Sequence, residues 1–234
     1  GLPNAGKSTL INNLVNEKVS IISHKVQTTQ NAIRGVFTKS HSQIIFTDTP
    51  GLILPSTFFK KQLSRAIFNN TYESDINLVV FDPNRKISEK EKEILKKLIR
   101  TSKNNFLIIN KIDLVKKTEL LKISEKYNHL FNFEKTFMIS ALKKKGLNEL
   151  IEVIITKLPK NKWLYDKRDK TDQKNEFIFS EITREKVFQL INKEIPYDIS
   201  ITAEINLNKI TQFIFVKKAS QKPVLIGKEG KKIK

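Results

Sequence analysis

The first residues of the chain, GLPNAGKS from Gly1 to Ser8, have the types and spacing of a loop that binds phosphate. Glycines let backbone N–H groups approach phosphate oxygens, and a helix beginning near Lys7 adds the positive end of its dipole. In the pattern G-x-x-x-x-G-K-[ST], Lys7 neutralises the β- and γ-phosphates and the Ser8 hydroxyl ligates Mg²⁺. The sequence therefore predicts a nucleotide site that includes Gly1, Asn4, Ala5, Gly6, Lys7, Ser8 and Thr9.

A second motif, Asp48-Thr49-Pro50-Gly51, follows the apolar run QIIFT. That position places Asp48 at the C-terminal end of a strand, where ligands bind in open α/β sheets. A carboxylate there can hold Mg²⁺ together with Ser8, and the Gly51 N–H can meet the γ-phosphate. Taken alone, D-x-P-G is more typical of a solvated turn. Its place after a phosphate loop favours the nucleotide site.

Two further motifs indicate which base is bound. Asn110-Lys111-Ile112-Asp113 follows the strand-like run FLII. The Asp113 carboxylate can accept both N1–H and the N2 amine of guanine, whereas adenine presents no such donor pair. The Lys111 stem can lie across the base, and Asn110 can tie this loop to the phosphate loop. Ser140-Ala141-Leu142 would then supply a backbone N–H to guanine O6.

These motifs require strands and helices that bring them to one edge of a sheet. Short β-branched runs alternate with helical patterns up to Leu158, which predicts an α/β domain with a mostly parallel sheet. Ser88 and Glu91 form a capping box before a helix with Ile94, Leu95, Leu98 and Ile99 on one face. A final amphipathic helix ends at Leu158. The expected strands are Ile33 to Thr38, Gln43 to Thr47, Ile76 to Asp82, Asn105 to Asn110 and Lys135 to Ile139.

The C-terminal part of the chain has a different pattern. Residues 159–174 are polar, charged and without period, which indicates a linker between a domain at 1–158 and a second domain at 175–234. The second domain begins with a helix from about Asn175 to Glu194, and DISITAEINL and ITQFIFVKKA then alternate like two paired strands. The chain closes with VLIGKEGKKIK, which contains a Gly-x-x-Gly turn.

Composition narrows the class of protein without identifying a partner. The chain has 234 residues, no cysteine and a net charge of +19. The absence of cysteine excludes disulfides and fits a reducing cytoplasm. The positive charge favours a polyanionic partner, but it is spread over both domains and is equally compatible with a lysine-rich composition throughout. No apolar run approaches the length of a membrane span.

The four nucleotide motifs, in this order, resemble the translation-factor-related GTPases, and in particular the branch with the loop G-x-P-N-x-G-K-S. The resemblance implies a mobile switch in which a threonine ligates Mg²⁺ when the γ-phosphate is bound. VQTTQN, residues 26–31, matches this switch. Thr29 is the favoured ligand, but Gln30 stands where the family pattern has arginine, which leaves Thr28 open.

The same resemblance bears on hydrolysis. Ras-like enzymes carry a water-orienting glutamine at the position of Leu52, and leucine cannot hydrogen-bond to water. In the G-x-P-N branch the loop asparagine, here Asn4, can ligate a potassium ion that replaces an arginine finger, with carbonyls near residues 20–25 as further ligands. An alternative is that Asn4 only supports the turn. The resemblance thus implies GTP and GDP as ligands, Mg²⁺ and K⁺ as cofactors, and Lys7, Asn4 and Thr29 as the catalytic residues.

The C-terminal domain resembles a type II KH domain, because a helix and two strands precede a GxxG turn. SEITREK and EIPY, within residues 180–197, are similar to the start of the KH domain in the Era family of GTPases. In KH domains the GxxG loop clamps the backbone of single-stranded nucleotides. The resemblance therefore implies an RNA-binding turn formed by Gly227, Lys228, Glu229, Gly230 and Lys231.

Era-like proteins imply 16S ribosomal RNA and the 30S subunit as partners, a role in 30S assembly, a monomeric cytoplasmic protein, no DNA binding, and peripheral association with the inner face of the cell membrane. The resemblance departs at both ends. The first strand of the GTPase domain is missing before Gly1, and the KH domain stops before its last strand and helix. We therefore expect the sequence to be part of a longer protein.

Two other hypotheses fit parts of the sequence. A related GTPase that acts in tRNA modification or large-subunit maturation would share the nucleotide motifs, but the GxxG unit argues against it. A non-catalytic RNA-binding protein with a degenerate nucleotide site would share the KH pattern, but Lys7, Ser8, Asp48 and Asp113 are all retained.

Overall fold

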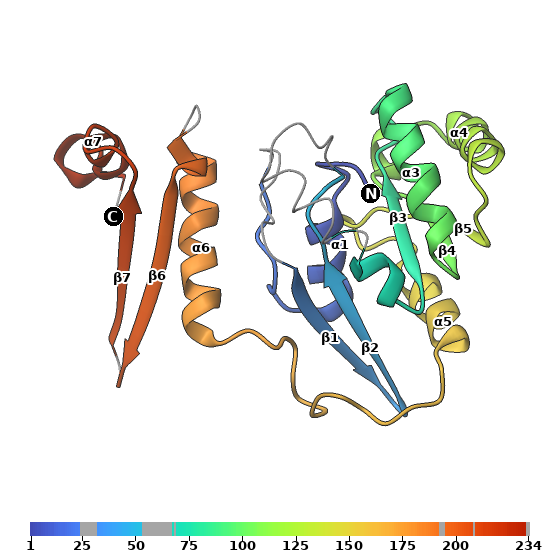
Figure 1. The fold of residues 1–234 in the computed structure, drawn as a ribbon, viewed down its shortest axis with the longest axis horizontal. Helices are drawn as coiled ribbons and strands as arrows, with labels where there is room; N and C mark the ends of the chain where they lie inside the picture. Colours follow the sequence, from blue (N-terminus) through green and yellow to red (C-terminus); the bar gives the residue numbers. More distant parts are fainter. Residues whose placement is uncertain (24–31, 53–66, 68, 192–194, 208, 233–234) are drawn as a thin grey trace. The chain divides into compact units, whose positions relative to one another are not determined.

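A computed structural model describes residues 1–23, 32–52, 67, 69–191, 195–207 and 209–232 (Figure 1). The chain divides into two compact units. The first contains Gly1–Ser20 and Thr29–Asp172, and the second contains Ile21–Thr28 and Gln173–Lys234.

The first unit is built on a parallel sheet of three strands. These strands are β3 (Asn77–Phe81), β4 (Asn105–Ile109) and β5 (Lys135–Met138), in the order β3-β4-β5. All five residues of β4 are buried, as expected for a central strand that is covered on both faces. The predicted strands at these three places are confirmed, and the observed strands end one residue earlier than expected.

Helices cover both faces of this sheet. Val80, Phe106 and Ile108 pack in one cluster with α1 (Lys7–Val15) and α5 (Leu147–Lys157). The alternate residues of the same strands pack in a second cluster with α3 (Glu89–Thr101) and α4 (Lys117–Leu130). Because successive strand side chains point to opposite faces, the two clusters lie on opposite sides of the sheet. This is the layered α/β arrangement that the alternating pattern predicted.

The α3 helix begins as predicted. The Ser88 side chain accepts a hydrogen bond from the Glu91 amide at 3.3 Å, and the Ser88 amide donates to the Glu91 carboxylate at 3.0 Å. Leu95, Leu98 and Ile99 are buried on the face that the spacing indicated. In contrast, α4 was not predicted from the sequence.

The remaining two strands of the first unit lie outside the predicted parallel sheet and form an antiparallel pair. β1 (Ile33–Lys39) and β2 (Ser42–Asp48) pair antiparallel from Ile33–Asp48 to Lys39–Ser42 and form a separate sheet. Within the described residues, no strand joins β2 to β3. The short turn between β1 and β2 dictates the antiparallel pairing, because parallel strands need a long crossover.

The segment expected to be a linker, residues 159–174, contacts this hairpin over much of its length. The Val36 amide donates to the Lys170 carbonyl at 2.8 Å, and the Thr171 hydroxyl donates to the Arg34 carbonyl at 2.7 Å. Further along, the Gln43 side-chain oxygen accepts hydrogen bonds from the amides of residues 164 and 165. The compact first unit accordingly extends to Asp172.

The second unit contains one long helix and a β-hairpin. The helix α6 (Asn175–Leu190) packs on one face of β6 (Ile199–Asn206) and β7 (Lys209–Val216), which pair antiparallel. Three short elements flank the hairpin: the 3₁₀ turn η2 (Ile195–Tyr197) precedes it, and α7 (Gln221–Ile226) and the 3₁₀ turn η3 (Lys228–Gly230) follow it. The core comprises Val187, Ile191 and Leu225, with Ile199, Ile201, Ile214 and Val216 against them.

Candidate functional site

The loop from Gly1 to Ser8 has the backbone conformation of a phosphate-binding turn. Asn4 and Gly6 adopt positive φ angles of 59° and 90°. A Cβ at Gly6 would lie 2.3 Å from the Asn110 side-chain nitrogen, so only glycine fits this close approach. α1 begins directly after it at Lys7. The amides at the start of that helix are available to phosphate, as the sequence predicts.

Lys7 lies at the centre of this loop. Its ammonium group donates to the Leu2 carbonyl at 3.0 Å, which holds the side chain back over the loop. Burial lowers the pKa of Lys7, and the negative charge of Asp48 partly offsets that effect. The attraction between such a buried cation and a phosphate group is stronger than it would be in water, because the surrounding dielectric constant is lower.

Oxygen ligands converge beside Lys7. The Ser8 hydroxyl donates to Asp48 Oδ2 at 2.6 Å, and the Ser20 hydroxyl donates to the same oxygen at 2.6 Å. Asp48 is only 1% exposed, at the end of β2. Hydroxyl and carboxylate oxygens are the ligands that Mg²⁺ prefers, so this donor set fits the predicted metal.

Asn110 and Lys111 join the base-reading motif to the phosphate loop. The buried Asn110 side chain donates to the Ala5 carbonyl at 2.9 Å and accepts from the Ala141 amide at 2.8 Å. The Lys111 ammonium donates to the Asn4 carbonyl at 2.8 Å and pairs with Asp82 at 2.7 Å. The expected tie between the two motifs is therefore present.

Asp113 is exposed and turned toward the 140–142 loop. A hydrogen bond from the Ser140 side chain lowers the pKa of Asp113, which keeps the carboxylate ionised and able to accept two hydrogen bonds. The Ser140 amide donates to the Lys145 carbonyl at 3.1 Å, and the Ala141 amide is already bonded to Asn110. Of the three residues expected to offer an N–H to guanine O6, Leu142 is the one whose amide is not used in these two bonds.

The D-x-P-G segment closes over the loop. A Cβ at Gly51 would lie 2.8 Å from the Pro3 backbone, and the Leu52 amide donates to the Gly1 carbonyl at 2.9 Å. The Leu52 side chain is 4% exposed and packs with Leu2 in the hydrophobic cluster of the α3 face. Leu52 is thus a core residue, consistent with its inability to orient water.

Thr29 and the alternative Thr28 lie outside the described residues, as does Gln30. Their predicted role in Mg²⁺ binding stays a prediction. Of the carbonyls expected near residues 20–25 as potassium ligands, the Ser20 carbonyl accepts a hydrogen bond of 2.7 Å from Asn12.

The roles of three side chains in the site were not found from the sequence. The Ser20 hydroxyl donates to the same Asp48 oxygen as the Ser8 hydroxyl. The Asn12 side-chain oxygen positions Ser20 by accepting a hydrogen bond of 2.9 Å from the Ser20 amide. Asp82 anchors Lys111. A signal existed for Asp82, because the predicted strand ended on it and polar residues at that edge of a sheet bind ligands. For Ser20 and Asn12 no pattern in the sequence carried the signal.

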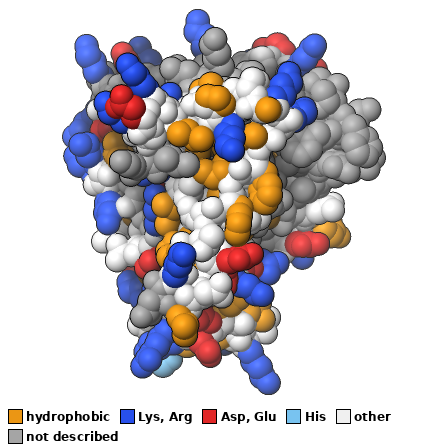
Figure 2. Space-filling view, turned by 90° about the vertical axis from the view of Figure 1, so that its left-hand side faces the viewer, with side chains coloured by type: hydrophobic (Ala, Val, Ile, Leu, Met, Phe, Trp, Pro, Cys, Tyr) orange, Lys and Arg blue, Asp and Glu red, His pale blue; other side chains and the backbone are white. Residues whose placement is uncertain are grey.

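The GxxG turn lies in the second unit, after α7. Gly227 has φ 74° and ψ 171°, a region essentially restricted to glycine, and Glu229 and Gly230 also have positive φ angles of 55° and 72°. Lys228 and Lys231 are exposed. On the face shown in Figure 2, hydrophobic side chains gather nearer the middle, and most lysine and arginine side chains lie toward the margin, with a few among the hydrophobic ones.

Comparisons with known proteins agree with this geometry. A family profile described as "50S ribosome-binding GTPase" matches residues 1–111. GTPase Era of Syntrophus aciditrophicus is 37% identical over the whole chain, which covers 79% of that protein. A crystal structure of Era with MgGDPNP and nucleotides 1506–1542 of 16S ribosomal RNA matches the whole chain and 82% of Era, with 31% identity and a TM-score of 0.91.

A structure of Era from Aquifex aeolicus bound to GDP·AlF₄⁻ matches equally well, with 31% identity and a TM-score of 0.91 over 100% of this chain and 82% of that one. A full-length match at this identity, together with the same fold and four nucleotide motifs joined by direct contacts, shows common descent. The chain belongs to the Era family of GTPases.

Proposed function

We propose that the first unit binds GTP and hydrolyses it to GDP and phosphate. The observation that carries this proposal is the single polar network that joins the phosphate loop to the other motifs. Ser8 contacts Asp48, Asn110 contacts Ala5, and the Ala141 amide contacts Asn110. A degenerate nucleotide site would have no reason to keep these side chains in contact, so the non-catalytic alternative is disfavoured.

Hydrolysis requires attack of water on the γ-phosphorus while the bond to the leaving oxygen of GDP breaks. Lys7 and the loop amides stabilise the negative charge that spreads over the transferred group. Ser8 and Asp48, together with the predicted Thr29, would hold Mg²⁺, which would further neutralise the β- and γ-phosphates. Leu52 orients no water, and we infer that Asn4 instead holds a potassium ion near the phosphates.

Substitution of Asp113 tests which base the site recognises. Asp113→Asn replaces an acceptor by a donor opposite the guanine N2 amine, whereas xanthine carries an oxygen there. We expect the affinity for GTP to fall about 10- to 100-fold and that for xanthosine triphosphate to rise, because hydrogen bonds to charged groups contribute about 1.5–3 kcal/mol. Competition against a fluorescent guanine nucleotide measures both affinities.

Asp166→Asn, an exposed substitution in residues 159–174, is the matched control and should leave both affinities unchanged. If Asp113→Asn binds GTP as tightly as the unsubstituted chain, Asp113 does not read the base.

We propose further that the predicted KH domain, residues 175–234, binds 16S ribosomal RNA and that the protein assists assembly of the 30S subunit. The conformation of the Gly227–Gly230 turn supports this proposal, because backbone restricted to glycine permits close approach of an RNA backbone. The relative with 16S ribosomal RNA bound supports the partner. The profile described as "50S ribosome-binding GTPase" favours large-subunit maturation, but it matches residues 1–111 only, whereas the relative with 16S ribosomal RNA matches the whole chain.

Substitution of Lys228 tests whether the Gly227–Gly230 turn binds RNA. Lys228→Glu should weaken binding of an RNA with the sequence of 16S nucleotides 1506–1542 by at least about tenfold at low salt, because a phosphate contact becomes a repulsion. Lys97→Glu on α3 changes the net charge equally at another exposed site and should weaken binding less than about twofold. Equal losses in the two variants would contradict the assignment, and a fluorescence anisotropy titration distinguishes the outcomes.

The remaining expectations are a monomer without affinity for DNA, and peripheral association with the inner membrane face. Among the described residues, no helix is long and apolar enough to cross a membrane. Cosedimentation with anionic vesicles tests the peripheral association.

A further inference from the structure

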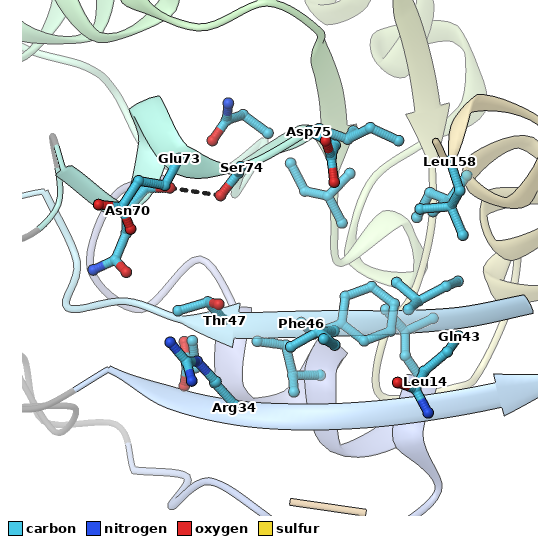
Figure 3. A pocket seen from close by; sticks show the side chains of 18 of the residues that line it. Leu14, Arg34, Gln43, Phe46, Thr47, Asn70, Glu73, Ser74, Asp75 and Leu158 are labelled. Atoms are coloured by element: carbon cyan, nitrogen blue, oxygen red, sulfur yellow. Dashed lines mark hydrogen bonds between the residues drawn. The ribbon is translucent and has the colours of Figure 1, made fainter. Parts of the chain in front are cut away.

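Two cavities of the first unit differ in what surrounds them. The cavity drawn in Figure 3 has Gly1 and Lys7 in its lining and therefore adjoins the nucleotide site. A smaller cavity of about 240 Å³ lies between α4 and the segment that leads into α3. We call it the α3–α4 cavity. None of the functions proposed above uses it.

Part of the lining of the α3–α4 cavity is aliphatic. Ile87, Ile123 and Leu130 line it and pack against the hydrophobic cluster of the α3 face. Tyr127 also lines it, but this residue is only 6% exposed and its ring stacks on Phe81 at a centroid distance of 4.6 Å. The cavity thus offers an apolar surface that the core holds in place, and its aromatic ring is already covered.

The charged part of the lining is entirely cationic. Arg85 and Lys86 come from the loop before α3, Lys92 from α3 and Lys126 from α4. Lys86 and Lys126 are exposed, and neither forms an ion pair with another residue in the described part of the chain. Two positive charges at the rim are therefore left without compensation by the first unit.

Arg85 is fixed in position and still has a donor to offer. Its Nη2 donates to the Glu91 carboxylate at 2.6 Å, and its amide donates to the Asp82 carbonyl at 3.0 Å. Its Nη1 is buried and has no hydrogen-bond partner among the described residues. Because a buried donor without a partner is unfavourable, an occupant that brings an acceptor oxygen is favoured.

These groups indicate the chemistry of an occupant. Arginine and lysine side chains only donate, which suits carboxylates better than nucleobases, since bases carry donors of their own. Single-stranded RNA would also need an open aromatic ring on which to stack, and Tyr127 is covered. The volume is below the roughly 300–1,000 Å³ that is usual for small-molecule sites, so one side chain can fill it.

We propose that the α3–α4 cavity docks an acidic segment of a partner protein. One large aliphatic side chain of the segment enters the cavity, and carboxylates on either side of it meet the cations. The cations come from three elements, so a chain segment can reach them together whereas a single small acid cannot. In such interfaces a buried anchor supplies most of the affinity, and the charges around it steer the approach.

A short peptide tests this site on the 234-residue chain. The probe is a capped pentapeptide with one leucine between two pairs of acidic residues, and backbone amide shifts in NMR report where it binds. It should bind with a Kd below about 1 mM and shift the amides of Ile87, Lys92 and Ile123. A weaker Kd, or shifts that avoid these amides, would overturn the proposal.

Two altered peptides separate an anchored segment from simple charge attraction. Serine in place of leucine keeps the charge, and amides in place of the carboxylates keep the anchor. Each change should weaken binding at least about fivefold, because the proposal requires both parts. Equal binding of the serine peptide would show charge attraction alone and contradict the proposal. Shifts of the same amides by a uridine oligonucleotide and not by the leucine peptide would assign the cavity to RNA instead.

Substitutions in α4 complete the test. Lys126→Glu should weaken binding of the leucine peptide at least about fivefold at low salt, since an attraction becomes a repulsion. Lys117→Glu makes the same charge change at an exposed position of the same helix, outside the cavity lining, and should weaken binding less than about twofold. Equal losses in the two variants would contradict the proposal. None of these readouts needs a nucleotide, so their outcome is independent of the proposed GTPase activity.

Discussion

Asn4 is an exposed residue of the phosphate loop, and its backbone is fixed by both its conformation and a contact. Its backbone has φ 59°, a conformation that asparagine and glycine tolerate best, and its carbonyl accepts the Lys111 ammonium at 2.8 Å. The backbone role explains why a small residue stands here but leaves open why it carries an amide. The difference between asparagine and glycine at this position therefore isolates the side chain.

We expect GTP hydrolysis to be at least about tenfold faster in potassium than in sodium at matched ionic strength, equivalent to about 1.4 kcal/mol of transition-state stabilisation. Asn4→Gly should abolish this difference, because it keeps the positive φ and removes the side-chain oxygen. Phosphate release measured in both salts provides the comparison. A potassium advantage that survives in Asn4→Gly would contradict the role of Asn4 as ligand.

At this scale the sequence indicated residue types better than contacts. Ser8, Asp48 and Asn110 could be assigned because each stands in a motif whose chemistry requires its type. Ser20 could not, since its contact with Asp48 depends on the path of the chain after α1, which no local pattern encodes. The hydrogen bond from the Ala141 amide to the Asn110 side chain could not be predicted either. It depends on where two loops 31 residues apart in the sequence lie in space.

At the scale of elements, the site exists because three loops leave the same edge of the sheet. Asp82 follows β3, Asn110 follows β4 and Ala141 lies just beyond β5, and the strands are parallel. The Asn110 side chain bonds to Ala5 of the phosphate loop and to Ala141 beyond β5. It therefore joins the ends of β4 and β5 to the phosphate loop. Its removal should therefore affect the arrangement of loops and not a single contact.

Asn110→Ala should lower the free energy of unfolding of the first unit by about 2–6 kcal/mol, because two buried backbone groups lose their partners at about 1–3 kcal/mol each. Nucleotide affinity should fall as well. Asn128→Ala removes exposed side-chain hydrogen bonds to Ser124 and Thr136 and serves as the control, with a loss below about 1 kcal/mol. Similar losses in urea unfolding of both variants would argue against the bridging role.

Elements with strong local signals were predictable. The buried strand β4 is a run of β-branched and aromatic residues, and the capping box at Ser88 specifies the start of α3. The antiparallel direction of β1 relative to β2 was not predicted, because short β-branched runs indicate strands but not how they pair. The contacts of residues 159–174 with β1 and β2 were missed for a similar reason, since a polar segment without period carries no signal for docking.

At the scale of the whole molecule, the chain joins a nucleotide unit to a second unit with a glycine-restricted turn. The net charge of +19 fits a partner rich in phosphate, although the charge is distributed over both units. The division of labour between the units makes their functions separable: Lys228→Glu should leave hydrolysis intact, and Asp113→Asn should leave RNA affinity intact in the absence of nucleotide.

The most direct test of the account is phosphate release from GTP and from ATP under single-turnover conditions with Mg²⁺. The account predicts release from GTP and not from ATP, and loss of that release in Lys7→Ala, since Lys7 is the charge beside the transferred group. Release from ATP at the same rate, or release from GTP that is unchanged in Lys7→Ala, would contradict it.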